Sequence, residues 1–234
     1  MNGSSKHFIN REFLAPNVLE IDVDVGIIES LSGVSHLLQQ HGNFEGMVDI
    51  GNGVRLHCEH PDWKSDIFWL SQADRAGYDY FEDLFRRLGV AEAVAAKIAG
   101  DREIVLYSGF FVTRGDCREP DFHCDWIGAN NDAFTFIGPV SDNCGELGLT
   151  YMTMRNQPEN YRYQPGKGLV FGDFFRHSTA AGESKARTVF LSFTFGTDKM
   201  ENWPKIAATA AKQGMFYRQP DGKFVTRAAK PVGY

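Results

Sequence analysis

The chain has 234 residues, of which 43% are hydrophobic, and a formal net charge of −6. This length and apolar content suffice for one domain with a substantial core, while the negative charge disfavours a nucleic-acid partner, which needs a basic surface to replace counterions. No apolar run is long enough to cross a membrane and the first residues are polar, so we expect a cytoplasmic protein without a signal peptide.

The first 102 residues are expected to be mostly helical and to support the remainder of a single domain spanning residues 1–234. Mixed apolar spacing over residues 8–25 predicts a short, irregular extended segment. Apolar residues then recur at helical intervals over residues 26–40, and Gly42 follows as a stop signal, so we predict an amphipathic helix there. Residues 77–100 predict one or two further helices that break near Gly89.

Two features between these helical stretches are open to more than one interpretation. Residues 63–70 include Phe68 and Trp69, and predict either a strand or a wall of a substrate cavity. His57 and His60 form a weak candidate metal pair. Because no acidic or cysteine ligand lies in a regular element nearby, and Pro61 indicates a loop, a structural role is favoured for both histidines.

From residue 103 the sequence changes to short β-rich runs separated by turn residues, which is typical of a sandwich or jelly roll. We predict strands over residues 104–113, 133–140, 147–155, 161–163, 168–171 and 187–195, and an extended segment over 121–126. Residues 103–198 would then be the β core. A closing helix is predicted over residues 199–213, and the remaining residues, to 234, would form a hairpin, a lid or a dimer contact.

His123 and Asp125 lie two residues apart in the extended segment. Because side chains alternate along a strand, both project from one face and can bind the same metal ion. His177, which follows 54 residues after His123, would complete a set of two imidazoles and one carboxylate. This ligand set is typical of non-heme Fe(II) sites, where it leaves coordination positions open for a cosubstrate and dioxygen.

With these residues the chain resembles the Fe(II)- and 2-oxoglutarate-dependent oxygenases of the double-stranded β-helix superfamily, over roughly residues 104–198. The resemblance rests on the His123-x-Asp125 pair, on Phe171-Gly172-Asp173 before His177, and on Arg187 ten residues after it. It implies a mainly β fold with flanking α-helices, in the form of a cupin-like jelly roll.

The resemblance also implies a role for each residue. His123, Asp125 and His177 would bind Fe(II), and Arg187 would bind the far carboxylate of 2-oxoglutarate, for which a planar guanidinium is suited. With O2 as the second cosubstrate, the enzyme would oxidise a C–H bond of a small metabolite, such as an amino acid or related carboxylate, and release succinate and CO2. The outcome would be hydroxylation, desaturation or cyclisation.

Two positions bear on this resemblance. Related halogenases carry a small residue in place of the metal-binding carboxylate, so Asp125 argues against halogenation. Val189 stands where many members of the family have a serine, which leaves a second hydroxyl contact to the cosubstrate unassigned. The candidates for that contact are Tyr107, Thr135, Thr150 and Tyr151.

Other basic and aromatic residues have competing interpretations. Arg114, Arg155 and Arg176 are candidates to bind an anionic group of the substrate, although each is equally well explained as a solvated charge at a strand end. Trp126 would either line the cavity or pack between sheets.

Two alternatives to the oxygenase remain open at this point. One is a cupin-like sensor or ligand-binding protein whose metal is structural, and the other is a cupin dioxygenase that uses no keto acid. For the leading interpretation we expect a small-molecule substrate, no nucleic-acid or membrane partner, and a monomer or homodimer. The four cysteines form no CxxC pair and are expected to be reduced thiols.

Overall fold

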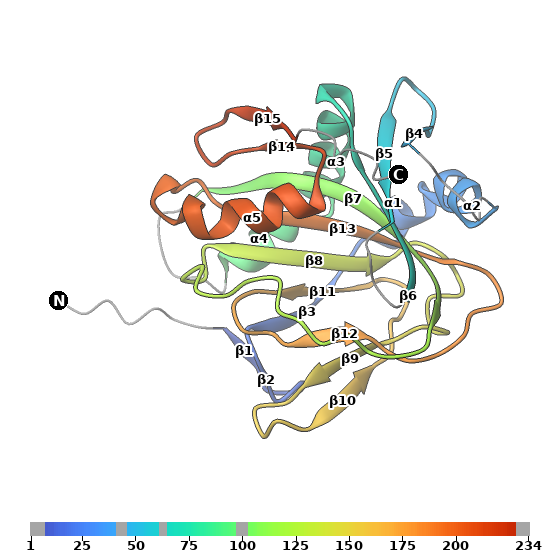
Figure 1. The fold of residues 1–234 in the computed structure, drawn as a ribbon, viewed down its shortest axis with the longest axis vertical. Helices are drawn as coiled ribbons and strands as arrows, with labels where there is room; N and C mark the ends of the chain where they lie inside the picture. Colours follow the sequence, from blue (N-terminus) through green and yellow to red (C-terminus); the bar gives the residue numbers. More distant parts are fainter. Residues whose placement is uncertain (1–7, 41–45, 61–64, 97–102, 228–234) are drawn as a thin grey trace, which may run out of the picture.

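The structure, a computed structural model, describes residues 8–40, 46–60, 65–96 and 103–227, and is built around an antiparallel sheet of eight strands (Figure 1). In spatial order these are β3 (Val18–Asp22), β11 (Lys167–Phe171), β8 (Ala133–Pro139), β13 (Thr188–Thr197), β7 (Ile104–Cys117), β6 (Ser65–Gln72), β5 (Arg55–Glu59) and β4 (Gly46–Asp49). A smaller sheet pairs β10 (Pro158–Tyr161), β9 (Leu149–Met152) and β12 (His177–Thr179). Two packed sheets with flanking helices confirm the predicted mainly β jelly roll.

Two short hairpins complete the β structure. β1 (Ile9–Asn10) pairs with β2 (Ala15–Pro16) in the segment that was predicted to be irregular or extended. β14 (Phe216–Arg218) pairs with β15 (Phe224–Thr226) after the last helix, which makes the C-terminal segment a hairpin as far as residue 227. Residues 228–234 of the predicted tail lie outside the described part of the chain.

The helices follow the predicted pattern with one difference. α3 (Arg75–Arg87) and α4 (Val90–Ala95) are separated at Gly89, whose φ of 64° is left-handed, as the break near Gly89 predicted. The closing helix is α5 (Trp203–Gln213), preceded by a 3-10 turn, η1 (Met200–Asn202). The single helix expected over residues 26–40 is instead two, α1 (Val25–Glu29) and α2 (Ser32–Gln40).

The N-terminal part of the chain is not mostly helical, because it supplies strands β1–β6 as well as α1–α4. β6 pairs with β7, so the larger sheet continues across the boundary that was expected near residue 103. β4 and β5 then extend the sheet to its edge. The described N-terminal part therefore supplies part of the β core, in addition to covering it with helices.

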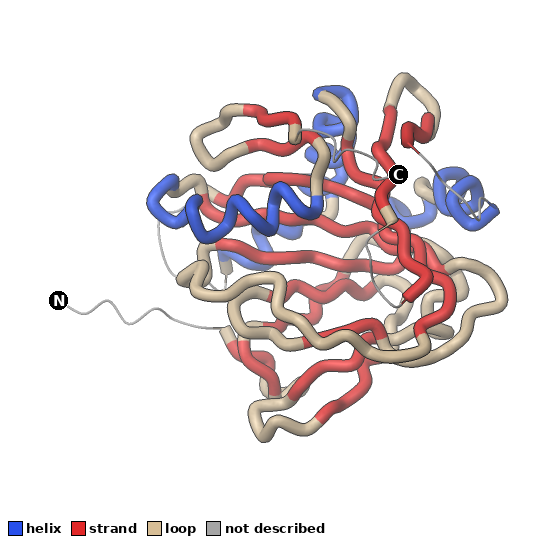
Figure 2. The backbone as a smooth tube through the Cα atoms, viewed as in Figure 1, coloured by secondary structure: helices blue, strands red, loops and turns tan. Residues whose placement is uncertain are grey.

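The two faces of the larger sheet are buried against different partners, and Figure 2 shows α5 in front of this sheet with α4 behind it. On the outer face, α1–α4 pack on Phe111, Phe136 and Leu191. The inner face packs against the smaller sheet through Phe110 and Phe190. Neighbouring residues of a strand point to opposite faces. The parity of a residue, meaning whether its position is odd or even along the strand, therefore decides whether its side chain reaches the interior.

We expect Gly109→Ala to lower the free energy of unfolding by about 2 kcal/mol, because overpacking a buried contact typically costs 1–3 kcal/mol. α3 crosses β7 where Phe81 lies on Gly109, and a Cβ at this position would come within 2.3 Å of the Phe81 side chain, which is fully buried. Gly33→Ala is the matched control, since an added Cβ in α2 would meet no atom within 4 Å among the described residues outside its chain neighbours and its own helix backbone.

The control should raise the free energy of unfolding by roughly 0.5–1 kcal/mol, because alanine favours a helix over glycine. Urea denaturation followed by circular dichroism measures both variants. Equal effects of the two substitutions would contradict the packing of α3 on β7.

Cys58, Cys117, Cys124 and Cys144 are free thiols, as the sequence predicted. Within the ranges that the structure describes, no helix is both long and apolar enough to cross a lipid bilayer.

Candidate metal centre

The three predicted metal ligands, His123, Asp125 and His177, come together at the start of β12. The segment that carries His123 pairs with the start of β12, and the backbone N–H groups of His123 and His177 each donate to the other residue's carbonyl oxygen at 2.9 Å. The imidazole centroids are 4.7 Å apart, and Nε2 of His123 lies 3.6 Å from Oδ1 of Asp125. One ligand atom from each of the three residues falls within 4.8 Å of the others, so the group could hold a metal ion.

Both histidines have their Nδ1 atoms engaged by backbone carbonyls. Nδ1 of His123 lies 2.8 Å from the oxygen of Asp121, and Nδ1 of His177 lies 3.1 Å from the oxygen of Phe175. Because a carbonyl only accepts, each Nδ1 donates its proton to that oxygen, and the hydrogen bond fixes the orientation of the ring. This is the arrangement by which proteins orient metal-binding imidazoles.

Burial also keeps His177 in the state that a metal requires. Its removal from solvent lowers the pKa of His177 to about 4, although the nearby Asp125 carboxylate opposes this shift. Since the neutral imidazole is the form that binds metal ions, protons compete weakly for this ligand at neutral pH.

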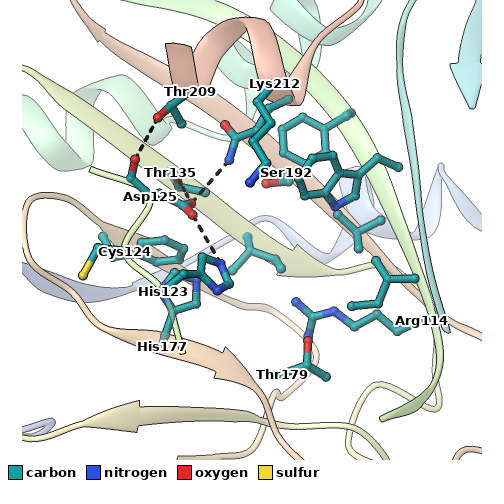
Figure 3. Close-up of a pocket in the computed structure, with 17 residues that line it drawn as sticks. Arg114, His123, Cys124, Asp125, Thr135, His177, Thr179, Ser192, Thr209 and Lys212 are labelled. Carbon is teal, nitrogen blue, oxygen red and sulfur yellow. Dashed lines mark hydrogen bonds and ion pairs between the residues drawn. The ribbon is translucent and has the colours of Figure 1, made fainter. Parts of the chain in front are cut away.

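A cavity of about 140 Å³ opens beside the three residues and is lined by side chains from both sheets and α5 (Figure 3). Its apolar wall comes from the inner face of the larger sheet: Ile67, Trp69, Phe110, Val112, Ile137 and Phe171. The prediction that residues 63–70 form either a strand or a cavity wall is resolved for residues 65–70, which do both; residues 63–64 lie outside the described part of the chain.

Arg114 is the arginine that lines this cavity. Its side chain extends into the pocket from the end of β7 (Figure 3), and only 7% of the residue is exposed. Its guanidinium lies over the rings of Phe190, at 4.6 Å, and Tyr163, at 5.8 Å. Nε and Nη1 of Arg114 have no hydrogen-bond partner within the described part of the chain. A buried cation with unsatisfied donors is costly unless an anion binds to it.

Arg187, the residue predicted to bind the cosubstrate, is not among the residues that line the cavity. It shares parity with Val189 and Leu191, which pack on the outer face of the sheet, and its guanidinium binds Asp66 at 2.7 Å and lies 4.7 Å from the ring centroid of Phe68. The structure thus brings together the three predicted metal ligands and separates Arg187 from them. The physical reason is that the side chains of β13 alternate between the two faces.

Each of the four hydroxyl groups suggested as cosubstrate contacts donates its proton to an oxygen of the protein. Tyr107 donates to the backbone oxygen of Thr197 at 2.6 Å, and Thr135 donates to Oδ2 of Asp125 at 2.7 Å. Thr150 donates to Oδ1 of Asn160 at 2.7 Å, and Tyr151 donates to Oε2 of Glu159 at 2.9 Å. Thr179, which the sequence did not single out, lines the cavity at the same end as Arg114 (Figure 3).

The remaining sequence candidates lie away from the cavity. Arg155 and Arg176 are exposed, with Arg176 over the ring of Phe122 at 5.6 Å. Trp126 is buried and donates through Nε1 to Thr135 at 3.1 Å.

The histidines of the weak candidate metal pair have other contacts. His57 lies 3.6 Å from Glu59, and the ring of His60 packs against Phe68 at 4.9 Å. Neither belongs to the group that could hold a metal ion.

Comparison with known proteins finds similarity only at the level of structure. No family model matches the sequence, and no curated protein matches it. A crystal structure of an oxidoreductase of the 2OG-Fe(II) oxygenase family from Burkholderia pseudomallei aligns with 77% of this chain and 84% of its own, with a TM-score of 0.51 and 9% identity.

Two further solved structures superpose equally well. The non-heme alpha ketoglutarate dependent epimerase SnoN from nogalamycin biosynthesis covers 76% of this chain and 77% of its own at 16% identity, with a TM-score of 0.51. EctD from S. alaskensis, in its apoform, covers 85% and 80% at 12% identity, with the same TM-score of 0.51. The chain therefore has the double-stranded β-helix fold found in 2-oxoglutarate- and Fe(II)-dependent oxygenases.

Proposed function

We propose that this chain is an Fe(II)- and 2-oxoglutarate-dependent oxygenase that oxidises a C–H bond of a small molecule. The observation that carries this proposal is the joint presence, in one cavity, of a two-histidine, one-carboxylate group and a buried arginine with unsatisfied donors. The first is a ligand set suited to non-heme Fe(II), and the second is suited to the distal carboxylate of a keto diacid.

The residues present fit the metal. One ligand atom from each of the three residues lies within 4.8 Å of the others, and Nδ1 of both histidines and Oδ2 of Asp125 are already hydrogen-bonded to the protein. The three ligands are thus already oriented by the protein, which reduces the cost of binding. Three protein ligands leave room on the metal for a bidentate keto acid and for O2.

Arg114, rather than Arg187, is the residue that we propose for the cosubstrate. A planar guanidinium forms two parallel hydrogen bonds with a carboxylate, and the guanidinium of Arg114 has donors, on Nε and Nη1, without a hydrogen-bond partner in the described part of the chain. Thr179, at the same end of the cavity, is the hydroxyl that we propose as the second contact. This assignment supplies the hydroxyl that the valine at position 189 cannot.

The apolar wall has a complementary role. When iron, 2-oxoglutarate and O2 are bound, they supply an oxidant strong enough to break a C–H bond, with release of succinate and CO2. Trp69, Phe110 and Val112 keep water away from this region and restrict which part of a substrate approaches. We propose a small metabolite as the substrate, on the basis of the cavity's volume of about 140 Å³.

The experiment is to remove metal with a chelator, add Fe(II) and 2-oxoglutarate under air, and measure succinate. We expect succinate only when Fe(II) is present. In parallel, Fe(II) under anaerobic conditions at about 100 times its dissociation constant should stabilise the fold by about 2.7 kcal/mol. For a chain of this length that corresponds to a rise in melting temperature of roughly 5–10 °C.

The two measurements together separate the proposal from its alternatives. A metal-dependent rise in melting temperature without succinate would favour a metal-binding sensor or a dioxygenase that uses no keto acid. Absence of both effects would contradict a metal centre altogether.

A further inference from the structure

The carboxylate of Asp125 is held so that its two oxygens have different surroundings. Oδ1 lies 3.6 Å from Nε2 of His123, on the side of the candidate metal site. Oδ2 accepts hydrogen bonds from Oγ1 of Thr135 at 2.7 Å and from Nε2 of Gln213 at 3.5 Å. A carboxylate oxygen that accepts two hydrogen bonds has little lone-pair capacity left for a metal.

Both donors are themselves fixed in orientation. Thr135 accepts from Nε1 of Trp126 at 3.1 Å, so its own proton is directed to Asp125. Gln213 is buried, and its Oε1 accepts from Oγ1 of Thr194 at 2.5 Å. Because a carboxylate only accepts, the amide nitrogen of Gln213 must face Asp125, and Thr194 must donate to the amide oxygen.

One of the two donors, Gln213, comes from a part of the chain far from Asp125. Gln213 ends helix α5, 88 residues further along, and Thr209, one helical turn before it, donates to the backbone oxygen of Asp125 at 2.9 Å. The last turn of α5 therefore contacts both the backbone and the side chain of one candidate metal ligand.

From this geometry we infer that Gln213 is a positioning residue, which holds Asp125 as a single-oxygen ligand by occupying Oδ2. The inference rests on the proposed metal site. Restricting the carboxylate to one oxygen leaves one more coordination position for the keto acid and O2 than a two-oxygen carboxylate would. α5, which lies outside the β core, thereby completes the metal site.

The test uses Co(II) binding to the full-length protein, measured by equilibrium dialysis, together with the visible absorption of bound Co(II), which reports coordination number. We expect Gln213→Met to raise the dissociation constant for Co(II) about 10-fold, since outer contacts to metal ligands typically contribute 10–100-fold. The absorption should also fall in intensity, as expected when Asp125 binds through both oxygens.

Gln72→Met is the matched control, because Gln72 is also a buried glutamine and does not line the cavity. Its side chain accepts from the backbone N–H of Gly109 at 2.8 Å and donates to the backbone oxygen of Phe216 at 2.7 Å. This substitution should lower the melting temperature and leave the Co(II) affinity and spectrum unchanged. A purely structural role for Gln213 would give the same result as this control.

If Gln213→Met fails to fold, Thr194→Val decides the question. That substitution removes the donor that orients the amide, and should raise the dissociation constant in the same direction by a smaller factor. The inference is overturned if the folded variants bind Co(II) as the wild type does, or if the control weakens Co(II) equally. Failure of the wild type to bind Co(II) would instead overturn the proposed metal site.

Discussion

Replacing Arg114 by methionine is expected to raise the KM for 2-oxoglutarate about 100-fold in the succinate assay. Hydrogen bonds to charged groups contribute about 1.5–3 kcal/mol each, so loss of a bidentate pair removes about 3 kcal/mol, and each 1.4 kcal/mol is a factor of ten. The KM of Arg114→Lys for 2-oxoglutarate should fall between those of the wild type and Arg114→Met, because lysine keeps the positive charge and lacks the planar guanidinium.

Arg187→Met is the control that distinguishes the two arginines. Arg187 binds Asp66, whose side chain is 43% exposed, and lies on Phe68, so its loss should lower the free energy of unfolding by about 1 kcal/mol or less. The KM for 2-oxoglutarate should stay within a factor of about two, far below the effect of removing a charged hydrogen-bond partner. A large rise in KM for Arg187→Met, with little change for Arg114→Met, would support the role predicted for Arg187 from the sequence and contradict the one proposed for Arg114.

The difference between these arginines explains what the sequence could and could not predict. β13 is buried along its whole length, on both faces. Thr188, Ser192 and Thr194 share the parity opposite to that of Arg187, but because both faces of the strand are buried, this alternation does not tell which face lines the cavity. Arg187 has the order and spacing of the family pattern, and yet its parity directs it to the helix-covered face. Arg114 stood among the sequence candidates without any feature that placed it in the cavity.

The candidate metal ligands could be predicted more readily from the sequence, because two of the three lie close together along the chain. His123 and Asp125 are two residues apart in extended backbone, where shared parity places them on one face. The lead-in Phe171-Gly172-Asp173 then located His177 by resemblance. The contacts that orient these side chains, from Thr135 and Gln213, depend on tertiary packing and leave no local signal.

Among the secondary elements, β4 and β5 were missed in the N-terminal part. Asn52-Gly53 lies between these strands and is a typical signal of a hairpin turn. Polar residues around it concealed the strands, because β4 is an exposed edge strand without an apolar face. The break between α1 and α2 was missed for the opposite reason, since the apolar spacing continues across Leu31.

Replacing His177 by alanine is expected to weaken metal binding by at least 100-fold. Loss of a residue that hydrogen-bonds to a metal ligand typically lowers metal affinity about 10–100-fold, and loss of a ligand itself should lower it by no less. His177 is the most buried of the three candidate ligands, and burial keeps its imidazole neutral. His57→Ala is the control, since His57 is a partly buried histidine that lies beside Glu59 instead of in the metal group.

Anaerobic equilibrium dialysis with Fe(II), followed by measurement of metal per chain, tests the central claim most directly. We expect one ion bound per chain in the wild type and in His57→Ala, and loss of that ion at the same free concentration in His177→Ala. Iron that remains bound in His177→Ala, or a wild-type protein that binds none, would contradict a metal centre formed by His123, Asp125 and His177.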